Sequence, residues 1–176
     1  MTGVQTCALP ILNREILRLR PDVNCVIHLH HDEMIAFMAA GYETIRSFSL
    51  TYGYLMQKPA HYLPASVNVE EDVGPIQSFI QDTNCIIMKR HGFTVLGRSV
   101  SEAYHRTCVL VSEIKRNIIV EQLCAANGRT PEYISDEELA YMAMAAPTMI
   151  PSTIPTMPPT TAPTKAPAWV EQTALL

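Results

Sequence analysis

The sequence predicts an α/β fold, and two kinds of segment support this prediction. Short apolar runs rich in valine and isoleucine, at 23–29 and 85–89, are typical of buried strands. A long segment from Ser99 to Gly128 carries the capping residues and the apolar spacing of an amphipathic helix. The chain has 176 residues, of which 48% are hydrophobic, and this is enough for one domain with a real core.

The chain begins with MTGVQTCALPI, which matches the translation of a common DNA-sequencing adapter when GTG is taken as the start codon. A match of this length is very improbable by chance. We therefore expect residues 1–11 to lie outside the natural protein. On this interpretation the genuine chain begins near Leu12, and its natural N-terminus is missing.

The first half of the sequence predicts a helix, a strand and a second helix. The first helix, 12–19, places apolar residues on one side and ends before Pro21, since the residue before a proline avoids the α region. The strand 23–29 follows. The second helix is short, with Asp32 as its N-cap or first-turn acid and Gly41 as the glycine just past its end.

The middle of the chain, 42–74, shows no clean periodicity. Tyr62–Leu63 and 66–69 are candidates for short strands. A turn and a proline then predict a helix over 76–80, because proline suits the first helical position. Two further strands follow, at 85–89 and 93–96.

Ser99 and Glu102 form a capping-box pattern that opens the longest predicted helix, which continues to about Ala126. Asn127-Gly128 closes it. One stripe of this helix is apolar, and we interpret it as core or as a subunit interface. The stripe comprises Ala103, Thr107, Val111, Ile114, Ile118 and Leu123.

The capping pattern recurs at Ser135 and Glu138 and predicts a short helix to about Ala146. The segment 147–176 is rich in proline and threonine, and such frequent prolines exclude helix and sheet interior. We expect it to be a disordered or polyproline-like tail. The predicted domain is therefore 12–146.

Composition argues against several classes of function. The net charge is −4 and no basic run is present, which argues against nucleic-acid and anionic-membrane surfaces. No stretch is long and apolar enough to span a membrane. The five cysteines lack C-x-x-C spacing, and several lie in apolar runs, which favours free thiols and a cytoplasmic location.

The candidate site combines two motifs at predicted strand ends. His28 and His30 are two residues apart at the end of the first strand, so their side chains point to the same face. His91 follows another strand and precedes a glycine. Three histidines with an open position are the ligand set of a catalytic zinc site. Either motif alone also suits structural histidines bonded to the backbone, and it is their combination that favours a metal.

The same residues resemble the class II aldolase/adducin family, and the spacing is similar to that of its fuculose-phosphate aldolase branch. The resemblance covers about 12–126, most of the chain. It rests on RPDVN at 20–24, H-x-H at 28–30, MKRHG at 88–92, Gly97, and SEAY at 101–104.

The resemblance implies a three-layer α/β/α sandwich around a mostly antiparallel sheet. It also implies that His28, His30 and His91 hold a divalent metal, usually zinc. Family enzymes form homotetramers and act on sugar phosphates, and their metal stabilises the enediolate formed on carbon–carbon cleavage. A glutamate serves as general acid/base and a tyrosine assists. Tyr52 is the candidate for that tyrosine, with Tyr54 nearby.

The sequence departs from the family pattern where the glutamate is expected, since this position is Leu9. The glycine- and serine-rich phosphate loops are also missing. We therefore expect a metal-binding but catalytically inactive fragment of a lyase. Two alternatives stay open. One is another family reaction, by an epimerase, a dehydratase or a decarboxylase. The other is an adducin-like interaction module, although such modules lack the three histidines.

Overall fold

The computed structural model describes residues 9–69 and 71–149. The adapter-like residues 1–8 and the predicted tail from residue 150 lie outside this range. The elements, in chain order, are α1 (Leu9–Leu19), β1 (Cys25–Leu29), α2 (Asp32–Ala39), α3 (Leu50–Met56), β2 (His61–Leu63), η1 (Gly74–Ser78), η2 (Ile80–Asp82), β3 (Cys85–Met88), β4 (Gly92–Gly97), α4 (Val100–Asn127) and α5 (Asp136–Met149).

The four strands form one sheet in the order β1-β4-β3-β2. β4 is antiparallel to both β1 and β3, and only β2 runs parallel to its neighbour β3. The sheet is therefore mostly antiparallel, as predicted. Because β4 is central, it brings together two segments, β1 and β3, that lie far apart in the sequence.

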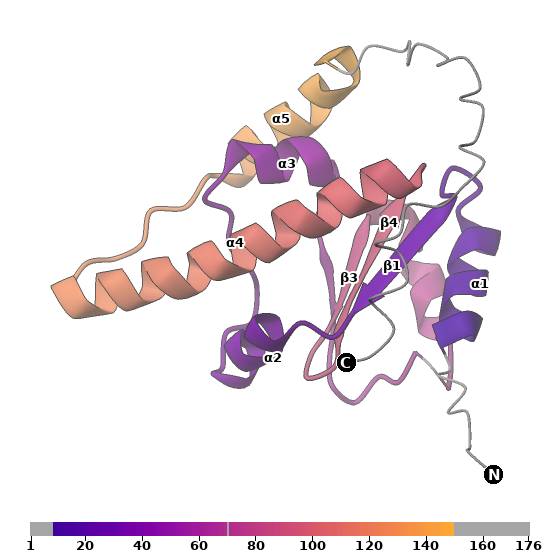
Figure 1. Cartoon of the computed structure of the whole chain (residues 1–176), viewed down its shortest axis with the longest axis horizontal. Coiled ribbons are helices and arrows are strands. Elements are labelled where there is room, and N and C mark those ends of the chain that lie inside the picture. Colours follow the sequence, from indigo (N-terminus) through magenta and orange to yellow (C-terminus); the bar gives the residue numbers. More distant parts are fainter. Residues whose placement is uncertain (1–8, 70, 150–176) are drawn as a thin grey trace, which may run out of the picture.

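Each face of the sheet carries its own hydrophobic core. Cys85 and Ile87 of β3 pack on one face, in a cluster that includes Leu110 of α4. Ile86 alternates with them on the opposite face and packs in a second cluster with Ile16 of α1. Figure 1 shows the same arrangement, with the sheet between α4 and α1. This confirms the predicted three-layer α/β/α fold.

In the middle of the chain, two predictions were wrong and one helix was not predicted. The segment 66–69 forms no strand, although Val69 is buried in the second core. The predicted helix over 76–80 is replaced by two short 3-10 helices, η1 and η2. The helix α3 was not predicted at all, because its residues LTYGYLM include glycine, threonine and aromatics of low helix propensity. It forms through packing against α4 and α5.

Helix ends agree more closely with the sequence. Ser99 Oγ accepts a hydrogen bond from the Glu102 amide at 3.1 Å, as the capping pattern predicts. The Glu102 carboxylate accepts from the Arg98 amide at 2.6 Å, one residue before the N-cap. Gly128 ends α4 with φ of +61°, in the left-handed region that glycine adopts without strain. α5 continues to Met149, past the predicted end near Ala146.

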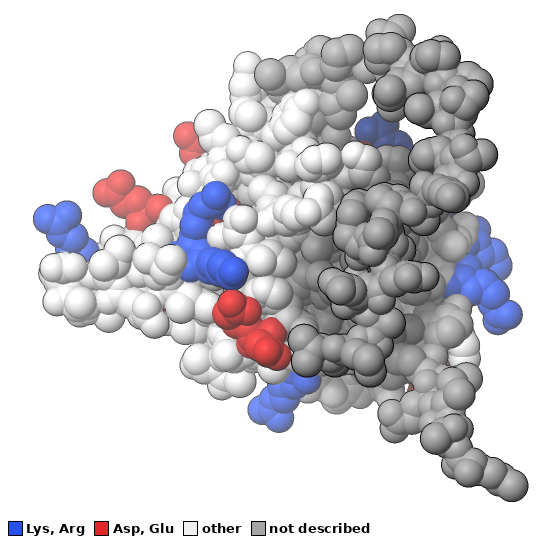
Figure 2. All heavy atoms as spheres, viewed as in Figure 1, with Lys and Arg blue, Asp and Glu red and all other residues white. Residues whose placement is uncertain are grey.

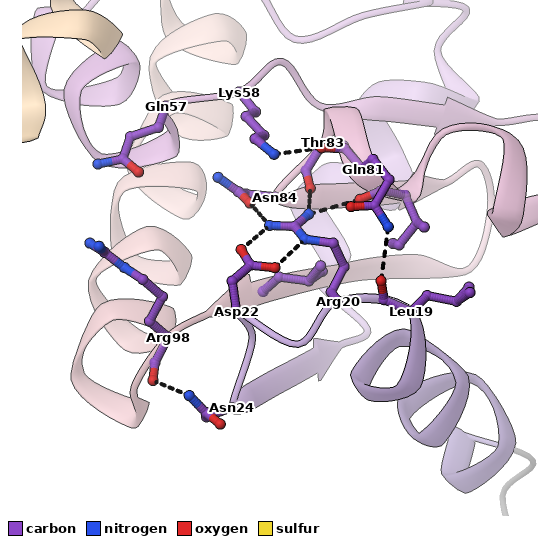
Figure 3. A network of polar contacts seen from close by, with 12 residues as sticks. Leu19, Arg20, Asp22, Asn24, Gln57, Lys58, Gln81, Thr83, Asn84 and Arg98 are labelled. Atoms are coloured by element: carbon purple, nitrogen blue, oxygen red, sulfur yellow. Dashed lines mark hydrogen bonds and ion pairs between the residues drawn. The ribbon is translucent and has the colours of Figure 1, made fainter.

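The Arg-Pro-Asp motif connects the segment before β1 with the segment before β3 through the buried side chain of Arg20, and we call these contacts the Arg20 brace (Figure 3). The Arg20 guanidinium donates to both carboxylate oxygens of Asp22 at 2.7 Å. It also donates to the carbonyl oxygens of Ile80 and Thr83 at 2.8 Å and to Asn84 Oδ1 at 3.1 Å. These bonds use every N–H group of the side chain. The brace therefore fixes the start of β1 against the start of β3.

The long helix α4 is only partly covered. Of the predicted apolar stripe, Ala103, Thr107 and Ile114 are buried against the sheet, whereas Leu123 is 58% exposed. Figure 1 shows the reason, since the C-terminal half of α4 extends beyond the sheet.

On the face seen in Figure 2, the charged side chains of the described residues are of both signs and are scattered among uncharged ones. No helix in the described ranges is long and apolar enough to cross a membrane.

Candidate metal centre

The three candidate histidines come from adjacent ends of the sheet. His28 lies on β1, and His30 follows directly after that strand. His91 lies in the turn between β3 and β4. Because β1 and β4 are antiparallel neighbours, the end of β1 lies beside the beginning of β4, where Leu29 pairs with Phe93. The turn that carries His91 is therefore held next to His30.

The three imidazoles converge. The ring centroid of His28 lies 4.9 Å from that of His30 and 5.2 Å from that of His91. The centroids of His30 and His91 are 4.7 Å apart. His30 Nε2 and His91 Nε2 are 2.9 Å apart. One nitrogen from each residue lies within 4.8 Å of the others. A zinc ion with bonds of about 2.0–2.1 Å needs its nitrogen ligands roughly 3.4 Å apart. The present separations, from 2.9 Å to at most 4.8 Å, bracket this value.

Gly92 makes this approach possible. A Cβ at this position would lie 2.4 Å from the Leu29 carbonyl oxygen and 3.1 Å from His30 Cδ2. Real Cβ atoms do not approach a backbone oxygen so closely. The glycine after His91 is therefore required for β4 to pass beside the end of β1, and this explains the His-Gly pair in structural terms.

His28 has the clearest signature of a ligand. Its Nδ1 lies 3.0 Å from Thr94 Oγ1, while its Nε2 is buried and has no hydrogen-bond partner in the described part of the chain. Burial, followed by the charges of His30 and His91, lowers the pKa of His28 to about 4. The ring is therefore neutral at pH 7, and a neutral imidazole is the form that binds a metal. A buried nitrogen without a partner is costly, and a cation would satisfy it.

His31 and its neighbours have a different role from the three converging rings. His31 Nδ1 accepts a hydrogen bond from the Met34 amide at 3.3 Å, so His31 is the N-cap of α2. Asp32 is thus a first-turn acid and not the cap. His31 Nε2 lies 3.4 Å from a Glu33 carboxylate oxygen. Histidine is an uncommon N-cap, and no sequence signal pointed to it.

Tyr52, the candidate assisting tyrosine, lies on α3 in the first core cluster and is 8% exposed. Burial raises the pKa of its hydroxyl well above the usual value, with further contributions from Tyr62, Cys85 and Glu113. It is therefore protonated at neutral pH. The group that could hold a metal consists of three histidines without a carboxylate, within the described residues. The catalytic role of Tyr52 stays a prediction.

Comparison with known proteins agrees with the motifs. The sequence matches the family model of the class II aldolase and adducin N-terminal domain over residues 12–116. It is 29% identical over 115 residues to an L-fuculose phosphate aldolase from Methanococcus maripaludis. That match covers 64% of this chain and 61% of the relative, so the chain spans about three fifths of the length of the relative.

Solved structures share the fold. YgbL from Klebsiella pneumoniae superposes with a TM-score of 0.65 at 17% identity, over 81% of this chain and 68% of that protein. L-fuculose 1-phosphate aldolase from Glaciozyma antarctica gives a TM-score of 0.61 at 18% identity, over 82% of this chain and 53% of that enzyme. At such identities the likeness speaks for the fold alone. The match of the family model over most of the chain, together with the converging histidines, shows that the chain belongs to the class II aldolase/adducin family.

Proposed function

We propose that His28, His30 and His91 hold a zinc ion or another divalent cation, and that the whole protein to which this chain belongs is an aldolase-type lyase acting on a small sugar phosphate. The observation that carries this proposal is the buried Nε2 of His28. It has no hydrogen-bond partner among the described residues, and it belongs to a neutral ring beside two other imidazoles. Membership of the class II aldolase/adducin family supports an aldolase-type reaction.

The ligand set suits this chemistry. Three imidazole nitrogen ligands favour zinc and leave a coordination position for substrate oxygen atoms. A bound divalent cation supplies Lewis-acid chemistry, which stabilises the negative charge that develops on oxygen when a carbon–carbon bond next to a carbonyl group breaks. Cleavage also needs a group that moves a proton. Tyr52 is our candidate for an assisting donor, since its raised pKa keeps it protonated.

Other reactions use the same type of site. An epimerase, a dehydratase or a decarboxylase of this family could use the same three histidines, so these remain the alternatives within the family. An adducin-like interaction module is the alternative from another class. The converging histidines favour the enzyme, because such a module has no need of them. A homotetramer and a cytoplasmic location belong to the proposal as well.

The metal content of the purified chain tests the proposal. We expect about one zinc per chain after removal of any histidine tag, dialysis and elemental analysis, and we expect His30→Ala to lose it. His105→Ala is the matched control, because His105 lies on the exposed side of α4 and bonds only within that helix. Absence of metal from the folded wild-type protein would instead support the interaction module.

Activity is a separate question from metal binding. The family glutamate is expected at the position of Leu9, and no carboxylate joins the three histidines in the described residues. We therefore expect the zinc-loaded 176-residue chain to show no retro-aldol activity on a ketose 1-phosphate. Release of dihydroxyacetone phosphate above the rate of the His30→Ala variant would contradict this expectation.

A further inference from the structure

The hydroxyl of Thr94 lies directly behind the candidate metal ligand His28. The two residues are register partners on β4 and β1, and Thr94 Oγ1 lies 3.0 Å from His28 Nδ1. Thr94 is fully buried, because β3 flanks β4 on the other side and places Ile86 beside it. The sheet therefore fixes the position of the hydroxyl relative to the ring.

The contact allows two arrangements of protons, and they have opposite consequences. A neutral imidazole carries one proton, either on Nδ1 or on Nε2. If Nδ1–H donates to the Thr94 hydroxyl, the lone pair lies on Nε2, the buried nitrogen that has no hydrogen-bond partner in 9–69 and 71–149. If the hydroxyl donates to Nδ1 instead, Nε2 carries the proton and has no lone pair for a cation.

We propose that Thr94 is a positioning residue for the metal centre: its hydroxyl accepts the Nδ1 proton of His28 and keeps the Nε2 lone pair available to the cation. The inference rests on the proposed metal site. A hydrogen bond to the outer nitrogen of a metal-binding histidine fixes both its tautomer and its ring orientation. In this chain the register of β1 with β4 supplies that partner.

Zinc affinity, measured by competition with a chromophoric chelator, tests the role of the hydroxyl. Thr94→Val keeps the shape of the side chain and removes the acceptor, and we expect zinc to bind about 10–100-fold more weakly. Thr94→Ser keeps the hydroxyl, and we expect it to bind zinc within about threefold of wild type. Thr107→Val is the control, because this buried threonine bonds the Ala103 carbonyl within α4 and is not part of the strands that carry His28 and Thr94.

The tautomer of His28 provides a readout that does not depend on activity. Nitrogen-15 NMR of the metal-free wild-type protein should show His28 protonated on Nδ1, and Thr94→Val should shift the ring toward the Nε2–H form. This spectrum is also informative if the valine variant folds poorly, since the wild-type tautomer alone bears on the inference.

The results separate the inference from the proposed function. If wild type binds zinc and a folded Thr94→Val binds it equally well, or if wild-type His28 is protonated on Nε2, Thr94 has no such role. The zinc site would then still stand. If wild type binds no zinc but His28 is protonated on Nδ1 only when Thr94 is present, the proposed function fails, whereas the control of the tautomer by Thr94 is upheld.

Discussion

At the scale of single residues, His28 shows both the strength and the limit of sequence reasoning. The spacing of His28 and His30 on one strand predicted two rings on one face, and the structure confirms that His91 joins them. The hydroxyl of Thr94 was not predicted, because its contact with His28 depends on the register between two strands far apart in the chain. A sequence pattern carries no information on such a register.

Gly92 gives the first residue-scale prediction. Gly92→Ala should destabilise the fold by about 1–3 kcal/mol through overpacking, because its Cβ would collide with the Leu29 carbonyl oxygen. It should also weaken zinc binding, since His30 lies at the same contact. Urea unfolding and zinc titration measure the two effects. Gly74→Ala is the control, because the three atoms nearest to its Cβ would all belong to the side chain of Asp72. If Gly92→Ala behaves like Gly74→Ala, the close approach is not a requirement of the site.

At the scale of elements, the sequence predicted those elements that have a local signal. The capping residues around Ser99 and Ser135 and the apolar runs of β3 and β4 are local, and these elements are present. α3 has no such signal, because it is stabilised by neighbours: Gly53 lies so close to α5 that a Cβ there would be 2.9 Å from Leu139 Cδ2. Helices of this kind are visible only once the tertiary contacts are known.

The Arg20 brace gives a prediction about acid stability. Hydrogen bonds from Arg20 lower the pKa of Asp22 to about 2, from an ordinary value of 3.8. A carboxyl group with a lowered pKa stabilises the folded state above its unfolded pKa, and this contribution is lost as the pH falls from 3.8 toward 2. The effect should be at most about 1 kcal/mol, since half of the Asp22 side chain is exposed to solvent.

Asp22→Asn isolates this contribution from those of the other carboxyl groups. We expect the variant to be less stable than wild type at pH 6, with the difference shrinking between pH 4 and pH 2 as Asp22 becomes protonated in wild type. Urea unfolding curves at a series of pH values measure this difference. A constant difference down to pH 2 would mean that the carboxylate charge does not stabilise the Arg20 brace.

At the scale of the whole molecule, the local patterns alone predicted only an α/β fold. The motifs identified the family, and the family resemblance predicted the three-layer arrangement. The motifs did not predict which surface of the chain would form a subunit interface. The apolar stripe of α4 was interpreted as core or as a subunit interface. The N-terminal half of the stripe is core. The C-terminal half of α4 extends beyond the sheet, where Leu123 of the stripe and Ile119, which lies outside the stripe, are more than half exposed.

This exposed half of α4 leads to a prediction about assembly. If it is a subunit interface, the wild-type chain self-associates, and the double substitution of Ile119→Lys and Leu123→Lys should give a monomer, because charged side chains are costly in an apolar interface. Helicity should be unchanged, since lysine is a good helix former. Sedimentation velocity measures the assembly state. Ile11→Lys, an exposed position on α1 across the sheet, is the control that should keep the wild-type state. A double variant that sediments like wild type would exclude this surface as the interface, and any tetramer would then use another face.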